Sequence, residues 1–254
     1  EIMIPYRDEN VTIRTPVITM ALIAANVLVW LGVQGAGGTM ALAASVCNLG
    51  LIPGELTGQA QPGAGFPMGS GLACLVDPGR APEHIFTSMF LHGGWLHLIG
   101  NMWFLRLFGN NVEDSMGRLR FLAFYLVCGV AAAMAQVLSA PSSIMPMVGA
   151  SGAISGVMGG YLVLYPRVRV FTLVPLGIFV TSVALPAWAM IGYWILLQVL
   201  GGLGSTTEAG GVAFWAHVGG FAAGALLIRI FARGDYVAEH QAQHWQPHRM
   251  TRIR

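Results

Sequence analysis

The chain has 254 residues, of which 55% are hydrophobic and 9% are charged, and its formal net charge is +2. A typical soluble domain has about 25% charged residues, so this composition excludes an ordinary soluble domain and predicts a polytopic membrane protein. The small net charge does not favour a nucleic-acid partner. The three cysteines lack the spacing of a metal site, and we expect no metal or other cofactor.

Six apolar runs of about the length that crosses a bilayer follow one another along the chain. They cover residues 16–33, 84–108, 121–138, 151–165, 186–200 and 212–231. A cleaved signal peptide is the alternative for the first run, which is long for that purpose. These runs predict an all-α fold with six transmembrane helices.

The fourth run, residues 151–165, is short because Pro166 stops it. As a helix it rises only about 22 Å, whereas a bilayer core is about 30 Å thick. If its far end lies at one interface, Ser151 lies roughly 8 Å below the opposite surface. A serine at that depth is well placed for chemistry inside a membrane. The alternative is a packing serine that lets two helices approach closely.

The connections between the runs differ in character. Residues 34–83 are rich in Gly and Pro, and an apolar patch at 40–46 could lie on the membrane surface. Residues 109–120 are predicted to form a charged loop, and residues 139–149 form a short loop without charge.

Residues 170–200 are apolar throughout and could contain one span or two. With six spans in total, nearly all arginines share one side of the membrane, which is the positive-inside pattern and makes both termini cytoplasmic. The arginines on that side are Arg7, Arg14, Arg118, Arg120, Arg167, Arg169, Arg233, Arg249, Arg252 and Arg254. Only Arg80 falls in a loop on the other side. We therefore expect residues 170–184 to be mostly interfacial and residues 186–200 to form the fifth span.

This topology predicts a cytoplasmic segment at residues 1–15, a six-helix domain at 16–233 and a cytoplasmic tail at 234–254. Cys47 and Cys74 both fall in the first loop, outside the cytoplasm, where disulfides are permitted. The geometry of the pair, and hence the bond, stays open at this point.

Four polar residues lie near the outer ends of the second, fourth and sixth spans: His97, Asn101, Ser151 and His217. Polar residues inside a membrane are costly and usually face a bundle interior or a wet cavity. Serine is a weak nucleophile until a base takes its proton, and His217 is the only histidine in the last span. Asn101, His97 and the Ser151 backbone N–H could stabilise an oxyanion. No carboxylate lies at this depth, so the pattern predicts a Ser–His dyad.

Small residues spaced four apart allow close helix packing on two of these spans. They are Gly152, Gly156 and Gly160, then Ser151, Ser155 and Gly159, and in the last span Ala216, Gly220 and Gly224. The fourth span is therefore expected to lie centrally, with the sixth span packed against it so that His217 meets Ser151.

Each of these residues also has a structural interpretation on its own. His97 could anchor the chain at the interface, Asn101 could bond two helices together, and His217 could be a satisfied histidine within the bundle. Their joint placement at one depth favours the catalytic interpretation.

Three segments resemble motifs of one family. GASGAI at residues 149–154 is similar to the nucleophile motif of rhomboid intramembrane serine proteases, HLIGN at 97–101 to their HxxxN motif, and AHVGGFAAG at 216–224 to their AHxxGxxxG motif. The motifs follow in family order and the resemblance covers residues 16–233.

The resemblance implies a bacterial-type rhomboid: a six-helix bundle with a short central fourth helix, cleaving transmembrane proteins in the lipid bilayer of the cell membrane. It implies Ser151 as nucleophile, His217 as base, and His97 with Asn101 around the oxyanion. Gly149, Gly152, Gly220 and Gly224 support the site. Residues 201–212 would cap the site, which opens to the extracytoplasmic side, and the fifth span would be a side gate.

One departure concerns the histidine. Relatives often carry an aromatic residue four positions after the serine, stacked on the catalytic histidine, whereas this chain has Ser155. Its hydroxyl could bond an imidazole nitrogen or the Ser151 carbonyl, and both readings stay open. What orients His217 is not given by the pattern.

Two other functions compete with a protease. A rhomboid-like pseudoprotease would normally lack the serine or the histidine, and a transporter would want paired charges or broken helices at mid-bilayer. We also expect Gln136 to help hold water near the site. The histidines of the tail, His240, His244 and His248, are expected to be solvated rather than to bind metal. Substrate identity and oligomeric state are not set by these patterns.

Overall fold

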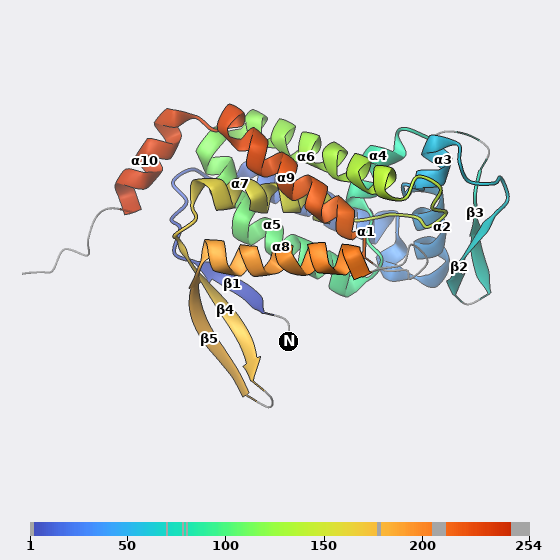
Figure 1. Ribbon diagram of the computed structural model, residues 1–254, viewed down its shortest axis with the longest axis horizontal. Helices are drawn as coiled ribbons and strands as arrows, with labels where there is room; N and C mark the ends of the chain where they lie inside the picture. Colours follow the sequence, from blue (N-terminus) through green and yellow to red (C-terminus); the bar gives the residue numbers. More distant parts are fainter. Residues whose placement is uncertain are drawn as a thin grey trace, which may run out of the picture.

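The computed structural model describes residues 3–69, 71–77, 79, 81–176, 179–204 and 212–244. Figure 1 shows a bundle of long helices that run along one axis, with short helices and a β-hairpin at one end. The helices are α1 (Val17–Gly32), α2 (Thr39–Leu49), α3 (Pro53–Thr57), α4 (His84–Thr87), α5 (Trp95–Met116), α6 (Arg118–Ser139), α7 (Ser151–Leu164), α8 (Ala187–Gly204), α9 (Phe214–Phe231) and α10 (Gly234–His244). The strands are β1 (Ile4–Asp8), β2 (Gly65–Gly69), β3 (Leu72–Leu75), β4 (Arg169–Leu176) and β5 (Phe179–Pro186).

Among the described residues, three helices are long and apolar enough to cross a membrane, namely α6, α8 and α9. The apolar helices α1 and α7 are shorter. A helix of at least 14 residues thus lies in each predicted apolar run, although α5 begins at Trp95 rather than at residue 84. The start of that run instead forms α4 and a 3-10 turn at Ser88–Phe90.

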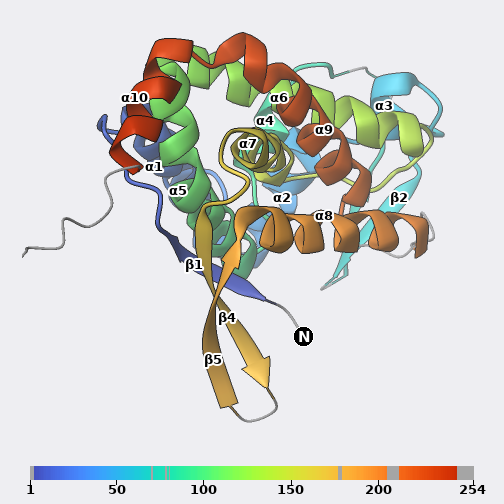
Figure 2. The ribbon, with the colours of Figure 1, turned by 60° about the vertical axis from the view of Figure 1, so that its left-hand side comes forward.

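Helix α7 lies among the other helices, and in Figure 2 it is seen nearly end-on between α5, α6, α8 and α9, all of which it contacts. Every residue from Gly152 to Tyr161 is buried. The helix begins at Ser151, two residues after Gly149, whose φ of +131° suits glycine, and it ends before Pro166. Its 14 residues rise about 21 Å, which is less than the roughly 30 Å thickness of a bilayer core.

The prediction of a charged loop at residues 109–120 is wrong, because α5 continues to Met116 and only Gly117 separates it from α6. Glu113 is buried, and its carboxylate accepts hydrogen bonds from the backbone N–H groups of Ile18 (2.9 Å) and Thr19 (2.8 Å). The first amides of a helix lack partners within the helix, and a negative charge there is favourable. The carboxylate therefore caps α1 and holds it against the end of α5.

The apolar segment that we expect to be mostly interfacial, residues 170–184, contributes to the paired strands β4 and β5. Strand β4 pairs with β5 and also, antiparallel, with β1 from the polar N-terminal segment, in the order β1-β4-β5. The end of β1 is tied to the helices, because Tyr161 of α7 donates a 2.6 Å hydrogen bond to Asp8, which also accepts one from Asn111 of α5.

The C-terminal segment is only partly a solvated tail. It forms α10, and His240 is buried, with its ring centroid 4.9 Å from that of Tyr165 at the end of α7. The prediction that His240 is solvated is therefore wrong. The His244 side chain and His248 lie outside the described residues.

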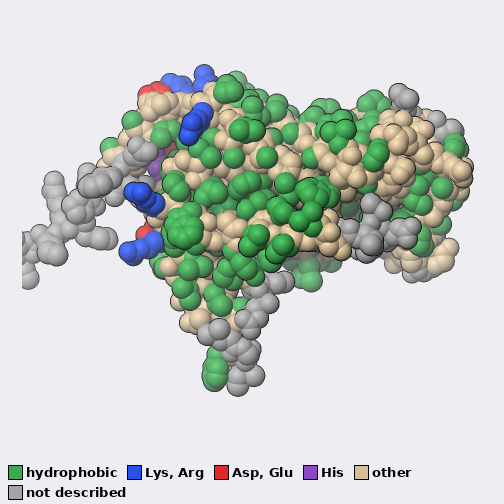
Figure 3. All heavy atoms as spheres, in the orientation of Figure 1, with side chains coloured by type: hydrophobic (Ala, Val, Ile, Leu, Met, Phe, Trp, Pro, Cys, Tyr) green, Lys and Arg blue, Asp and Glu red, His purple; other side chains and the backbone are tan. Residues whose placement is uncertain are grey.

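Arginine side chains and apolar surface are segregated. On the face in Figure 3, the basic side chains gather at the end that carries α10, while apolar side chains cover most of the surface between the two ends. Large apolar side chains are well exposed on the long helices, for example Leu138 on α6 and Leu226 on α9, each 76% exposed. Exposed apolar patches of this extent mark a surface that meets lipid or another protein.

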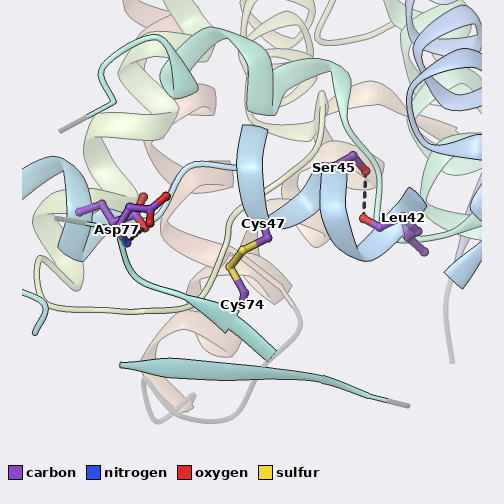
Figure 4. Close-up of a disulfide and its surroundings, with 6 residues drawn as sticks. Leu42, Ser45, Cys47, Cys74 and Asp77 are labelled. Atoms are coloured by element: carbon purple, nitrogen blue, oxygen red, sulfur yellow. Dashed lines mark hydrogen bonds between the residues drawn. A yellow bond between two sulfur atoms is a disulfide. The ribbon is translucent and has the colours of Figure 1, made fainter. Parts of the chain in front are cut away.

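The opposite end of the bundle is covered by the first connection, residues 34–83. Its surface patch at 40–46 lies in α2, and the hairpin β2–β3 packs against that helix. Figure 4 shows a disulfide between Cys47 of α2 and Cys74 of β3, whose Cα atoms are 5.3 Å apart. The bond closes residues 47–74 into a covalent loop, and Leu51 of the same connection pairs with Met147, which lies shortly before α7 in the chain.

Candidate active site

Ser151 and His217 meet at the N-terminal end of α7. The Ser151 hydroxyl oxygen lies 2.8 Å from His217 Nε2, which is hydrogen-bonding distance. Ser151 is the first residue of α7, whereas His217 lies in the first turn of α9. A hydroxyl that donates to a neutral imidazole can pass its proton to that ring, and this is the arrangement that activates a serine as nucleophile.

Close packing of α7 and α9 brings the two residues together. A Cβ atom added at Gly220 would overlap the carbonyl oxygen of Gly152, and one added at Gly224 would overlap that of Gly156. Only glycine lets the two backbones approach this closely. The expected contact between the small faces of the two spans is therefore present.

His97 of α5 approaches the same point through Gly149. The His97 Nδ1 accepts a 3.3 Å hydrogen bond from the backbone N–H of Gly93, so in the neutral ring Nε2 carries the proton. A Cβ at Gly149 would lie 2.8 Å from that Nε2 and 3.4 Å from the Ser151 hydroxyl. The absence of a side chain at Gly149 thus leaves an N–H donor facing the serine.

Asn101 lies one turn further along α5 than His97. Its side chain is 7% exposed, and its amide nitrogen has no hydrogen-bond partner among the described residues. A buried donor without a partner is costly, and such groups cluster at functional sites. Asn101 lines the same cavity as Ser151, so the donor is available to a bound group.

Two hydrogen bonds with Gln34 hold the backbone of His92, just before the start of α5. The side-chain amide of Gln34 donates to the carbonyl of His92 and accepts from its N–H, each at 2.8 Å. The buried ring of His92 in turn meets the ring of His97 edge-on, with centroids 5.2 Å apart. The sequence pattern does not predict the contact between Gln34 and His92, because the two residues are 58 positions apart.

A cavity of about 730 Å³ opens between α5, α7, α8 and α9. All four polar residues predicted from the sequence lie on its wall, together with apolar side chains such as Phe104, Met158 and Val212. The lining residues from the predicted constellation are His97, Asn101, Ser151 and His217. The predicted cap at 201–212 falls mostly outside the described residues, which leave out 205–211.

Ser155 faces the backbone. Its hydroxyl donates a 2.6 Å hydrogen bond to the carbonyl oxygen of Ser151, four residues back, which is the second of the two alternatives left open by the sequence. The side-chain oxygen of Gln136 accepts a hydrogen bond from the backbone N–H of Ala216 at 3.2 Å.

The second nitrogen of His217 has a partner that the sequence did not reveal. Nδ1 lies 2.7 Å from the side-chain oxygen of Gln198, and the ring centroid of Trp194 lies 5.8 Å from that of His217. Both residues come from α8. The available signal was the only side-chain amide in the fifth apolar run, with an aromatic residue four positions before it.

Comparison with known proteins identifies the family of this chain. A sequence profile of the Rhomboid domain matches residues 81–234, more than half of the chain. Rhomboid-like protease 5 of Toxoplasma gondii is 32% identical over 151 residues, which cover 56% of this chain and 15% of that protein. RHOMBOID-like protein 4 of Arabidopsis thaliana is 32% identical over 168 residues, with 65% and 39% covered.

A bacterial relative is also similar. The putative rhomboid protease YdcA of Bacillus subtilis is 36% identical over 78 residues, which cover 31% of this chain and 39% of that protein. The aligned part therefore spans between 15% and 39% of the length of these three relatives. With its apolar helices and the matched domain, the chain is a membrane protein and belongs to the rhomboid family.

Proposed function

We propose that the protein is a serine endopeptidase that hydrolyses peptide bonds within or next to the transmembrane helices of other membrane proteins. The observation that carries the proposal is the 2.8 Å contact between the Ser151 hydroxyl and His217 Nε2, on the wall of a cavity among apolar helices. Membership of a family whose relatives include proteins named as proteases supports the same conclusion.

In the proposed reaction the Ser151 oxygen attacks the carbonyl carbon of the scissile bond while its proton passes to His217 Nε2. The tetrahedral intermediate carries a negative oxygen that needs N–H donors. The unpaired amide of Asn101, the Nε2–H of His97 and the backbone N–H of Ser151 are the candidates. His217 then gives its proton to the leaving amine, and a water molecule repeats the sequence to release the acyl group.

The supporting residues act through geometry. Gly149 leaves room between His97 and the serine. Gly220 and Gly224 let α9 approach α7 to the short distance that the dyad needs, and Gly152 lets α7 approach Ala132 of α6. Ser155 shapes the first turn of α7 through the Ser151 carbonyl.

We also propose a membrane topology. Helices α1, α5, α6, α7, α8 and α9 cross the bilayer of the cell membrane as a domain at residues 16–233, with cytoplasmic segments at 1–15 and 234–254. The arginines gathered at the α10 end support a cytoplasmic location for that end. The disulfide at the other end supports an oxidising compartment beside Ser151.

The substrate is expected to reach the dyad from the bilayer. The cavity lies between α5 and α8 and combines apolar walls with the polar groups around Ser151. A transmembrane segment that partly unwinds could place one peptide bond at the serine from this direction. The family resemblance supports α8 as the side gate for this entry.

The test uses the full chain in liposomes with a single-span substrate that carries a fluorophore. The wild type is expected to cleave it, while Ser151→Ala and His217→Ala are expected to be inactive but folded, with an unchanged thermal unfolding midpoint. Ser139→Ala, an exposed serine at the end of α6, is the matched control and should keep full activity. Cleavage by Ser151→Ala at close to the wild-type rate would overturn the proposal.

A further inference from the structure

His217 needs more than proximity to Ser151. To accept the serine proton, Nε2 must be the unprotonated nitrogen, so the single proton of the neutral ring must be on Nδ1. The ring must also keep a fixed rotation. In the site described above, no carboxylate contacts His217, and the Ser155 hydroxyl is occupied by a backbone carbonyl. The group that meets Nδ1 therefore decides both the proton position and the ring rotation.

That group is the side-chain amide of Gln198. Its oxygen lies 2.7 Å from Nδ1, and its nitrogen donates a 3.5 Å hydrogen bond to the carbonyl of Trp194 in the same helix. The reverse orientation of the amide would set its oxygen against that carbonyl oxygen, so the second contact favours the orientation with the oxygen at Nδ1. An oxygen only accepts, so Nδ1 must carry the proton and Nε2 is left free to accept from Ser151.

Trp194 supplies the second constraint. It lies four residues before Gln198, so the two side chains project from one face of α8. Its ring is tilted 38° against that of His217, with centroids 5.8 Å apart. Aromatic pairs at this separation favour a defined mutual orientation. The ring and the amide together restrict the imidazole.

We propose that α8 positions the base of the dyad: Gln198 sets the tautomer of His217, Trp194 restricts its ring, and proton transfer from Ser151 is efficient only while α8 packs against α9. This inference rests on the proposed protease function. It makes Gln198 and Trp194 positioning residues, because both act on the reaction through His217.

The attachment of α8 gives the proposal a consequence for substrate entry. Helix α8 is only partly buried. Its buried residues are few, namely Ala187, Met190, Ile191 and Gly202. Trp194 also lines the cavity that contains Ser151. A segment that enters beside α8 therefore touches the element that holds the base, and displacement of α8 would release His217.

The test measures the rate at which a fluorophosphonate labels Ser151 in detergent, which needs no knowledge of the natural substrate. Gln198→Leu removes the acceptor in an apolar helix and is expected to slow labelling more than tenfold. Gln198→Glu keeps an oxygen in place and is expected to stay within about threefold of the wild type. Rescue by the glutamate separates positioning of the base from simple packing.

Matched variants complete the design. Leu196→Ala changes an exposed side chain of the same helix, 53% exposed, and should leave the rate unchanged. Trp194→Leu should slow labelling while Trp194→Phe, which keeps a ring, should not. If Gln198→Leu lacks a cooperative thermal transition, the comparison of Trp194→Leu with Trp194→Phe tests the inference in its place. A folded Gln198→Leu variant that labels as fast as the wild type overturns this inference, whereas a wild type that is not labelled at all overturns the protease function itself.

Discussion

The Ser155 hydroxyl donates its hydrogen bond to the carbonyl oxygen of Ser151, 2.6 Å away, within the first turns of α7. A bond of this kind shapes a helix and contributes little to its stability. We expect Ser155→Ala to change turnover less than threefold and the free energy of unfolding by less than about 1 kcal/mol. Turnover of a transmembrane substrate and thermal unfolding check this. A tenfold loss of turnover at unchanged stability would instead assign Ser155 to the orientation of His217.

Gly220→Ala should destabilise the bundle, because the added Cβ would overlap the carbonyl oxygen of Gly152 in α7. Overpacking of this kind typically costs about 1–3 kcal/mol. Gly192→Ala is the matched control, since nothing lies within 4 Å of its added Cβ in α8, and it should be neutral or slightly stabilising. Denaturant titrations in mild detergent compare the two. Equal stability of both variants would contradict close packing of α7 and α9.

Asn101→Ala should lower turnover by roughly 10²–10³ if the amide is an oxyanion donor. Stability should change little, because the amide nitrogen has no partner among the described residues and truncation breaks no bond of that nitrogen. The two measurements together distinguish this role from that of an interhelical bond, whose loss would lower the unfolding midpoint. A large drop in stability with normal turnover of the remaining folded protein would exclude the oxyanion role.

Asp8 makes stability depend on pH. Burial raises the pKa of its carboxyl group from the ordinary value of 3.8 to about 6, even though Tyr161 donates a hydrogen bond to it. The folded protein therefore binds this proton more tightly than the unfolded chain, so the stability from this group is full below about pH 4 and is lost as the pH rises through 6.

Asp8→Asn removes that titration. The unfolding midpoint of the wild type relative to Asp8→Asn should therefore fall between pH 4.5 and pH 7. The difference between the two proteins is the informative quantity, since other groups titrate equally in both. Parallel curves across this range would show that Asp8 is not buried in the way described here.

Much of the site follows from the sequence, because its residues sit in short motifs with helical spacing. Ser151 and His217 meet as the small-residue faces of their helices predict, and His97 with Asn101 line the same cavity. The fourth apolar run forms α7 with its start at Ser151, since Gly149 and Pro166 bound it.

Other features depend on contacts that no local pattern encodes. Glu113 in the predicted charged loop is buried because its carboxylate caps α1, whose first amides lie 95 and 94 residues earlier in the chain. Strand β1 pairs with β4 across an even longer separation. Gln198 was missed because an apolar helix has no strong polar face, so its rotation about its own axis is set by tertiary packing rather than by periodicity.

The most direct test of the account is active-site labelling of the folded, full-length protein with a fluorophosphonate, followed by mass spectrometry of the labelled peptide. The account predicts that Ser151 is the modified residue, and that His217→Ala slows this labelling at least about a hundredfold while the protein stays folded. Absence of label on Ser151 in the folded wild type, or equal labelling of His217→Ala, would contradict the Ser151–His217 dyad.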